Sequence, residues 1–214
     1  MKGTADTLLV LLMLTNLALL GSSRLRACVR FMAMQGVLLG AYTVLSRWDD
    51  LSVRVVLLGI VSTGVKGVAF PWALFRSLRE TGAQREMEPF VGYSLSLLAG
   101  IVFLGVSMWL GWRLPLPGSA AGSLVVSAAF FSILTGLFLI VGRKKALTQV
   151  LGYLVMENGI YAFGIAVSHE LPVLIELGVL LDVLVAVFVM GIAIYHINRE
   201  FDHIDADRLK MLKG

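Results

Sequence analysis

Long apolar runs separated by short polar connectors dominate the hydropathy pattern of this chain. An α-helix needs about 20 consecutive apolar residues to cross the hydrocarbon core of a bilayer. Seven segments qualify, and they cover residues 5–22, 27–46, 52–78, 91–112, 119–141, 147–168 and 171–197. The pattern predicts an all-α, polytopic membrane protein with about seven transmembrane helices. Residues 1–197 would form this membrane domain, and residues 198–214 would form a tail.

The composition supports the same class of protein. Of all residues, 58% are hydrophobic and only 15% are charged, whereas soluble domains carry about 25% charged residues. The net charge of +4 fits arginines that anchor loops at a membrane surface, so we expect membrane lipid and no nucleic acid as a partner. The chain has one cysteine and three histidines, and it shows neither a metal-ligand cluster nor a motif for covalent chemistry. We therefore expect no cofactor, metal or catalytic centre in this chain.

The basic residues predict the orientation, because cytoplasmic loops of membrane proteins carry an excess of Lys and Arg. If the seven spans alternate in direction, one side of the membrane holds only Lys2, Arg47, Arg54 and Arg113. The other side holds Arg24, Arg26, Arg30, Arg76, Arg79, Arg85, Arg143, Lys144, Lys145, Arg199, Arg208, Lys210 and Lys213. This asymmetry predicts an outside N-terminus, a cytoplasmic C-terminus and a location in the cytoplasmic (inner) membrane. Within it, residues 143–145 are interpreted as a surface anchor.

Four charged residues lie more than one helical turn inside the predicted spans, namely Lys66, Glu157, Glu176 and Asp182. A charged side chain near the centre of a transmembrane helix costs roughly 2.5–3.5 kcal/mol on insertion scales, so such residues are rare without a task. They point to the handling of protons or ions, or to charged contacts between helices.

Glu157 belongs to a polar stripe of its predicted helix. Gln149, Tyr153, Glu157 and Tyr161 follow one another at intervals of four residues and therefore share one face. A carboxylate between two hydroxyl groups can form a hydrogen-bonded column that passes protons, because each link both donates and accepts. The alternative is that the stripe packs on a neighbouring subunit through hydrogen bonds between helices. We favour the proton relay.

The other three ionisable residues leave two interpretations each. Asp182 lies on a face of small residues that points it at protein, where it could relay protons or form a structural hydrogen bond. Glu176 lies less than two turns from the outer end of its span, where interfacial water could reach it. Lys66 lies too deep to reach the headgroups, and it is either a switchable charge or the fixed partner of an acid in another subunit. Pro71 follows it and predicts a kink beside the ammonium group, with the carbonyl of Gly67 unbonded.

The segment Gly152–Gly159, which reads GYLVMENG, resembles component E of hydrogenase-4, the membrane subunit of formate-hydrogenlyase-like complexes. The resemblance spans the chain and is densest from residue 142 onward. It includes Thr63, Lys66, Pro71, Pro172, Leu174, Glu176, Gly178, Asp182 and the closing residues 209–214. Residues 119–197 are in turn similar to the K subunit of respiratory complex I and to the C subunit of multisubunit Na+/H+ antiporters.

This resemblance implies a subunit of a membrane-bound group 4 nickel–iron hydrogenase complex of the formate hydrogenlyase type, which couples electron transport to proton reduction. The nickel–iron centre and the iron–sulfur clusters would belong to partner subunits. The expected partners are a peripheral hydrogenase module, a hydrogenase-anchoring membrane subunit and one or more antiporter-like membrane subunits. The implied role is proton translocation within the membrane arm. The relay residues would be Lys66, Tyr153, Glu157, Tyr161, Glu176 and Asp182. The alternatives are a structural adaptor without proton transfer and a subunit of a Na+/H+ antiporter.

Overall fold

The computed structural model describes residues 2–48, 53–80, 90–114, 122–143 and 145–167. Within these residues, six helices are long and apolar enough to cross a membrane. They cover Gly3–Gly21, Leu25–Ser46, Val55–Arg79, Tyr93–Arg113, Ser123–Gly142 and Leu147–Val167. They confirm the first six predicted spans, and they fit a multi-pass membrane protein. The seventh predicted span, which carries Glu176 and Asp182, and the tail lie outside the described residues.

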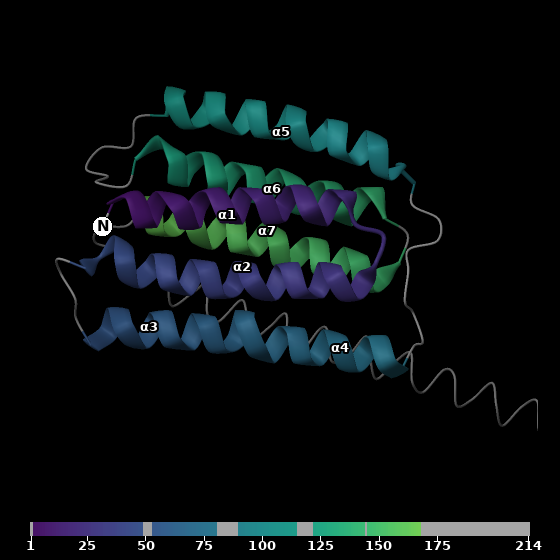
Figure 1. The fold of residues 1–214 in the computed structure, drawn as a ribbon, viewed down its shortest axis with the longest axis horizontal. Coiled ribbons are helices and arrows are strands. Elements are labelled where there is room, and N and C mark those ends of the chain that lie inside the picture. The colour runs from purple at the N-terminus through teal and green to yellow at the C-terminus, as the bar shows by residue number, and fades with distance from the viewer. Residues whose placement is uncertain (1, 49–52, 81–89, 115–121, 144, 168–214) are drawn as a thin grey trace, which may run out of the picture.

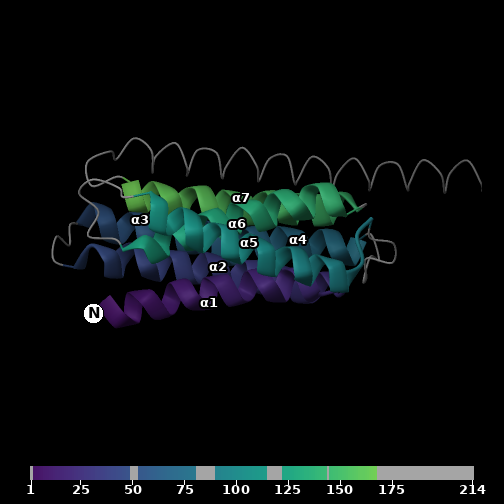
Figure 2. The same ribbon diagram turned by 90° about the horizontal axis from the view of Figure 1, so that it is seen from above.

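The helices lie side by side as an elongated bundle (Figure 1). In chain order the elements are α1 (Lys2–Gly21), α2 (Leu25–Ser46), α3 (Val53–Gly64), the π-helical segment η2 (Val65–Ala69), α4 (Phe70–Glu80), α5 (Tyr93–Arg113), α6 (Ser123–Gly142) and α7 (Ala146–Val167). Helix α5 lies at one edge, and the continuous span formed by α3, η2 and α4 lies at the opposite edge. Between them, α1 and α7 occupy opposite faces of the bundle, as the view from above shows (Figure 2).

Close helix contacts depend on glycines that meet a neighbouring backbone. A Cβ atom added at Gly152 of α7 would lie 2.9 Å from the backbone nitrogen of Ile140 in α6. A Cβ atom added at Gly36 of α2 would lie 2.6 Å from the carbonyl carbon of Lys66 in η2. Both distances are shorter than a carbon side chain tolerates, so these glycines let α7 approach α6 and let α2 approach η2. Small residues at such contacts are typical of packed membrane helices.

The third span differs in form from the sequence prediction. Pro71 predicted a kink, because proline lacks the N–H group that would bond the carbonyl of Gly67. The structure instead has the π-helical segment η2 two residues before Pro71, with the Phe70 N–H donating to the carbonyl of Val65, five residues earlier. Helix α4 then continues through the proline. The wider π turn accommodates the N–H group that Pro71 lacks. Lys66 lies within this turn and faces the bundle interior, where it is 2% exposed.

Candidate functional site

A buried ion pair joins the third span to α7. The Nζ atom of Lys66 lies 3.2 Å from the Oε1 atom of Glu157 and donates a hydrogen bond to it. The side chains of the two residues are 2% and 4% exposed. Both residues were predicted as site residues, and the structure brings them together. The alternative in which Lys66 pairs with an acid of another subunit is corrected, because an acid of the same chain lies against the ammonium group.

The pair has two protonation forms of equal net charge. One form is an ammonium facing a carboxylate, and the other is an amine facing a carboxylic acid, reached by moving one proton along the 3.2 Å hydrogen bond. Removing two charges from water is costly, and their attraction in a poorly polarisable interior offsets that cost only with good geometry. Such a pair titrates as a unit rather than as two independent groups. A group of this kind can accept a proton on one side and release it on the other.

Tyr161 extends the pair by one helical turn. The Nζ atom of Lys66 lies 4.8 Å from the centre of the Tyr161 ring, within the range of a cation–π contact. The Tyr161 hydroxyl lies 3.1 Å from the Oγ1 atom of Thr43 on α2. Thr43 already donates its proton to the carbonyl of Leu39, so the tyrosine hydroxyl is the donor in that contact. The hydroxyl groups lead from the pair toward the end of the bundle where α2 and α7 finish.

A second polar cluster, which we call the amide network, lies beside the pair. Gln35 of α2 donates from Nε2 to Oδ1 of Asn16 at 2.7 Å and to Oγ1 of Thr15 at 3.1 Å, both on α1. Asn158 of α7 donates to Oε1 of Gln35 at 3.3 Å. Asn16 donates to Oγ of Ser132 on α6 at 2.7 Å. All five side chains are buried. The amide network therefore fastens four helices together around the position next to Glu157.

The amide network and Thr43 were not predicted from the sequence. Their signal was present, because Asn16, Gln35 and Asn158 each interrupt an apolar run. Each is neutral, however, and the hydrogen bonds from α1 to α6 and from α2 to α7 join residues that are more than a hundred positions apart in the sequence. Only the packing of α1, α2, α6 and α7 shows that their polar atoms meet.

The remaining predicted residues take different places. Tyr153 is half-buried and packs against the apolar cluster that includes Val155 and Leu154. Within the described residues, no hydrogen bond joins Tyr153 to Glu157, and the Gln149 side chain donates instead to the carbonyl of Arg143 at 3.1 Å. Among the described residues, Glu157 forms no hydrogen bond with Tyr161 either, so the predicted hydrogen-bonded column along α7 is not formed on either side of Glu157. Asp182 and Glu176 lie outside the described residues.

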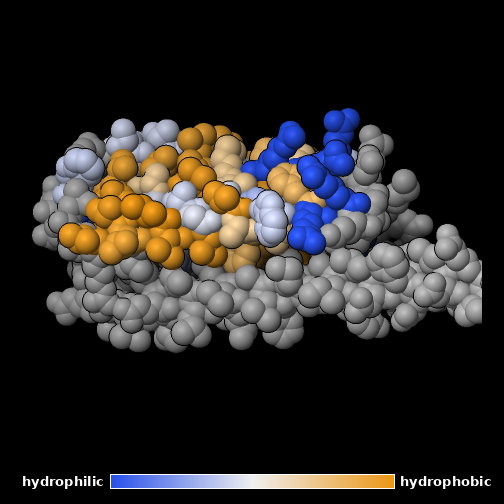
Figure 3. Space-filling view, turned by 90° about the horizontal axis from the view of Figure 1, so that it is seen from below, coloured by the Kyte–Doolittle hydropathy of each residue, from blue (hydrophilic) through white to orange (hydrophobic). Residues whose placement is uncertain are grey.

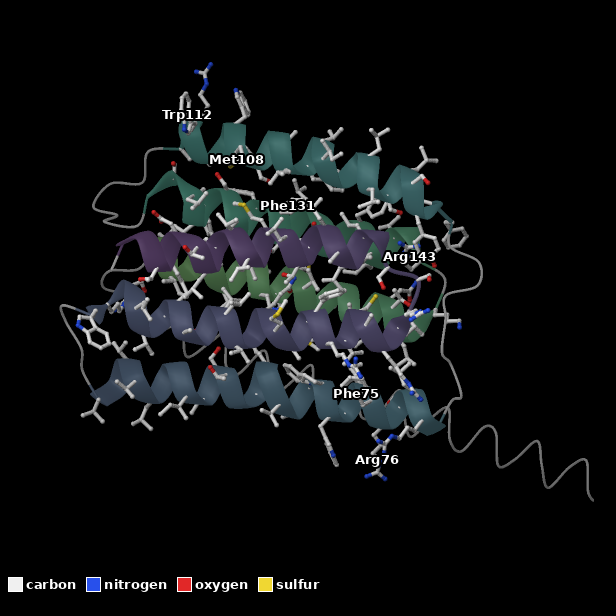
Figure 4. The ribbon with its side chains drawn as sticks, in the orientation of Figure 1. Phe75, Arg76, Met108, Trp112, Phe131 and Arg143 are labelled. Carbon is white, nitrogen blue, oxygen red and sulfur yellow. The ribbon has the colours of Figure 1, made fainter. Side chains whose placement is uncertain are left out.

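Arg143 also differs from the prediction. It was interpreted as part of a surface anchor, yet its side chain is buried. Its Nη2 atom donates to the carbonyl of Leu20 at 3.2 Å, and its guanidinium group lies 4.6 Å from the centre of the Tyr93 ring. Figure 4 shows Arg143 at the end of the bundle where α6 finishes. A cation near the last carbonyls of α1 stabilises that helix end, so Arg143 holds α1, α5 and α6 together.

Together these features define a multi-pass helical membrane protein with a buried lysine–glutamate pair in its core. Comparison with known proteins shows 33% identity over 205 residues with the uncharacterized protein Rv0085 of Mycobacterium tuberculosis. The alignment covers 94% of this chain and 92% of that relative. The chain therefore belongs to the same family as Rv0085. No family model matches the sequence, and no solved structure matches it.

A second group of relatives matches over a shorter length. Hydrogenase-4 component E of Escherichia coli strain K12 is 33% identical over 102 residues, and the protein of that name from Shigella flexneri matches to the same extent. The alignment covers 48% of this chain and 46% of those relatives, so it spans about half of each. The resemblance to this family is thus supported over about half of the chain and not over its whole length.

Proposed function

We propose that this chain is a membrane subunit of a hydrogenase-type complex and that it transfers protons within the membrane through the Lys66–Glu157 pair. The observation that carries the proposal is the buried pair itself, with its 3.2 Å hydrogen bond. The partial similarity to hydrogenase-4 component E supports the type of complex. We assign it to the inner membrane, between a hydrogenase-anchoring subunit and an antiporter-like subunit. The nickel–iron centre and the iron–sulfur clusters would reside in partner subunits.

The proposed transfer begins when the Lys66 ammonium passes a proton to the Glu157 carboxylate along their 3.2 Å hydrogen bond, which leaves an amine facing a carboxylic acid. The amine would then accept a proton from one side and the acid would release its proton to the other, which restores the ion pair. Tyr161 and Thr43 would provide the hydroxyl groups that lead away from the pair toward one end of the bundle. Tyr153, Glu176 and Asp182 remain proposed relay residues for the parts of the proton path beyond Lys66, Glu157, Tyr161 and Thr43. The amide network has no titratable group, so it would confine protons to the side of Glu157 that faces Lys66 and Tyr161.

The second candidate is a structural adaptor whose buried charges hold adjacent subunits in register. The amide network shows that helices of this bundle are fastened without any titratable group, but its contacts also join helices of one chain. The Lys66–Glu157 pair argues against it, since both charges belong to one chain and neutralise each other. A subunit of a Na+/H+ antiporter is the third reading, and it predicts sodium-dependent proton flux.

Neutral substitutions separate the first two readings. Glu157→Gln leaves the ammonium group unpaired, and breaking one partner of a buried pair costs about 3–5 kcal/mol. Adding Lys66→Met in the same chain removes both charges and should restore assembly. If the pair transfers protons, the double variant assembles with wild-type subunit stoichiometry while proton flux into sealed vesicles stays lost. If the pair is only structural, the double variant recovers both assembly and flux, and the proposal is wrong. Measuring flux with and without sodium tests the antiporter reading.

A further inference from the structure

Four side chains of α4 form a site that the proposed proton transfer does not use. Trp72, Phe75, Arg76 and Arg79 lie at intervals of three and four residues, so they share one side of the helix. They line a cavity of about 390 Å³. Both arginines and Trp72 are exposed, and the guanidinium carbon of Arg76 lies 6.0 Å from the centre of the Trp72 ring. Figure 4 shows Arg76 pointing away from the rest of the bundle.

The site lies where an apolar surface ends. Val53, Leu57, Ile60 and Val68 are exposed along the same span, as befits side chains that face acyl chains. Figure 3, which views the bundle from the side of α3 and α4, shows this apolar surface giving way to strongly hydrophilic residues toward one end. Arg79 is the last residue of the span. At a rise of 1.5 Å per residue, Arg76 lies about 4–5 Å and Trp72 about 10 Å from Arg79 along the helix axis. With Arg79 at the membrane surface, the guanidinium groups would lie among the headgroups and the indole ring would lie deeper in the interface, where tryptophan is enriched.

We propose that this site binds the headgroup phosphate of an anionic phospholipid. Two guanidinium groups one turn apart can both donate to phosphate oxygens, and arginine binds phosphate with paired, charge-assisted hydrogen bonds. The rings of Trp72 and Phe75 would contact the glycerol and the first acyl carbons. Basic pockets at the membrane surface, between transmembrane helices, recognise anionic headgroups through this chemistry.

The chain contains a matched control at the other end of the bundle. Trp109 and Arg113 of α5 repeat the spacing of Trp72 and Arg76, with the guanidinium carbon 5.7 Å from the ring centre. The two tryptophans are equally exposed, at 59% and 60%. Helix α5 ends at Arg113, so this pair has no second arginine one turn further on within its helix. A preference for anionic lipid should therefore appear at Trp72 and not at Trp109.

The test uses the full-length chain in lipid nanodiscs, with Trp72 or Trp109 as its single tryptophan and phenylalanine at the others. Fluorescence quenching is measured with brominated phosphatidylglycerol and, separately, with brominated phosphatidylcholine at the same mole fraction. We expect Trp72 to sense phosphatidylglycerol with about tenfold higher apparent affinity, and this preference should fall at high salt. Arg76→Gln with Arg79→Gln should abolish it, and Trp109 should show none.

Three outcomes overturn the proposal. Equal quenching of Trp72 by both lipids would show that the site does not select charge. A preference that survives loss of both arginines would place the anionic lipid elsewhere. Absence of quenching by either lipid would show that a protein segment covers the site. None of these outcomes bears on the Lys66–Glu157 pair, which is buried and is tested separately.

Discussion

Gln35 is the side chain on which the amide network depends, so Gln35→Met is its sharpest test. The substitution preserves the length of the side chain but removes three hydrogen bonds, to Thr15, Asn16 and Asn158. Hydrogen bonds between membrane helices contribute about 0.6 kcal/mol each on average, and the strongest reach about 1.7 kcal/mol. Three of them sum to about 2 kcal/mol. The polar atoms left unpaired in the core raise this figure further.

The expected result is therefore a loss of about 2 kcal/mol or more in the free energy of unfolding. Reversible unfolding of the purified protein in mixed micelles, titrated with denaturing detergent, measures this loss. Asn158→Leu is the graded comparison, because it removes only one hydrogen bond of the three. It should cost less than Gln35→Met. A loss below about 0.5 kcal/mol for Gln35→Met would refute the argument that these contacts stabilise the bundle.

Four further predictions concern single residues and the orientation of the chain. Gly36→Ala should lower the free energy of unfolding by about 1–3 kcal/mol and reduce proton flux, because the added Cβ would push α2 away from the backbone of Lys66. The control is Gly105→Ala, whose added Cβ meets no atom of the described residues within 4 Å and which should leave stability and flux unchanged. Thr43→Val should reduce flux without changing assembly, since it leaves the Tyr161 hydroxyl without its partner, and unchanged flux would exclude this link. Thr135→Val should raise the melting temperature, because the Thr135 hydroxyl is buried and has no hydrogen-bond partner among the described residues. A lower melting temperature would contradict that account. A fluorescent reporter at the C-terminus that matures only in the cytoplasm should light up, and a dark reporter would reverse the predicted orientation.

The six spans could be predicted from the sequence because each apolar run has the length that a bilayer requires. The charged site residues were also recognisable, since Lys66 and Glu157 are isolated charges in such runs. Their pairing was not predictable from local patterns. It depends on which helices become neighbours, and that choice is made by glycine contacts such as Gly36 against Lys66. Pro71 likewise signalled an irregular turn, which the structure forms as a π-helical segment.

The π-helical segment η2 also fixes how the side chains of α4 are rotated about the helix axis relative to those of α3. A π turn holds about one residue more than an α turn, so it offsets the two halves of the span by about 100° relative to an uninterrupted helix. Lys66 lies within this segment, and the arginines of α4 lie beyond it. If these five residues adopted regular α geometry with the sequence unchanged, one half of the span would turn against the other. Either the ammonium group would then leave Glu157, or Arg76 and Arg79 would turn away from the membrane surface. The wide turn at residues 65–69 therefore sets the angle around the helix axis between Lys66, which faces the core, and the arginines of α4, which face the lipid.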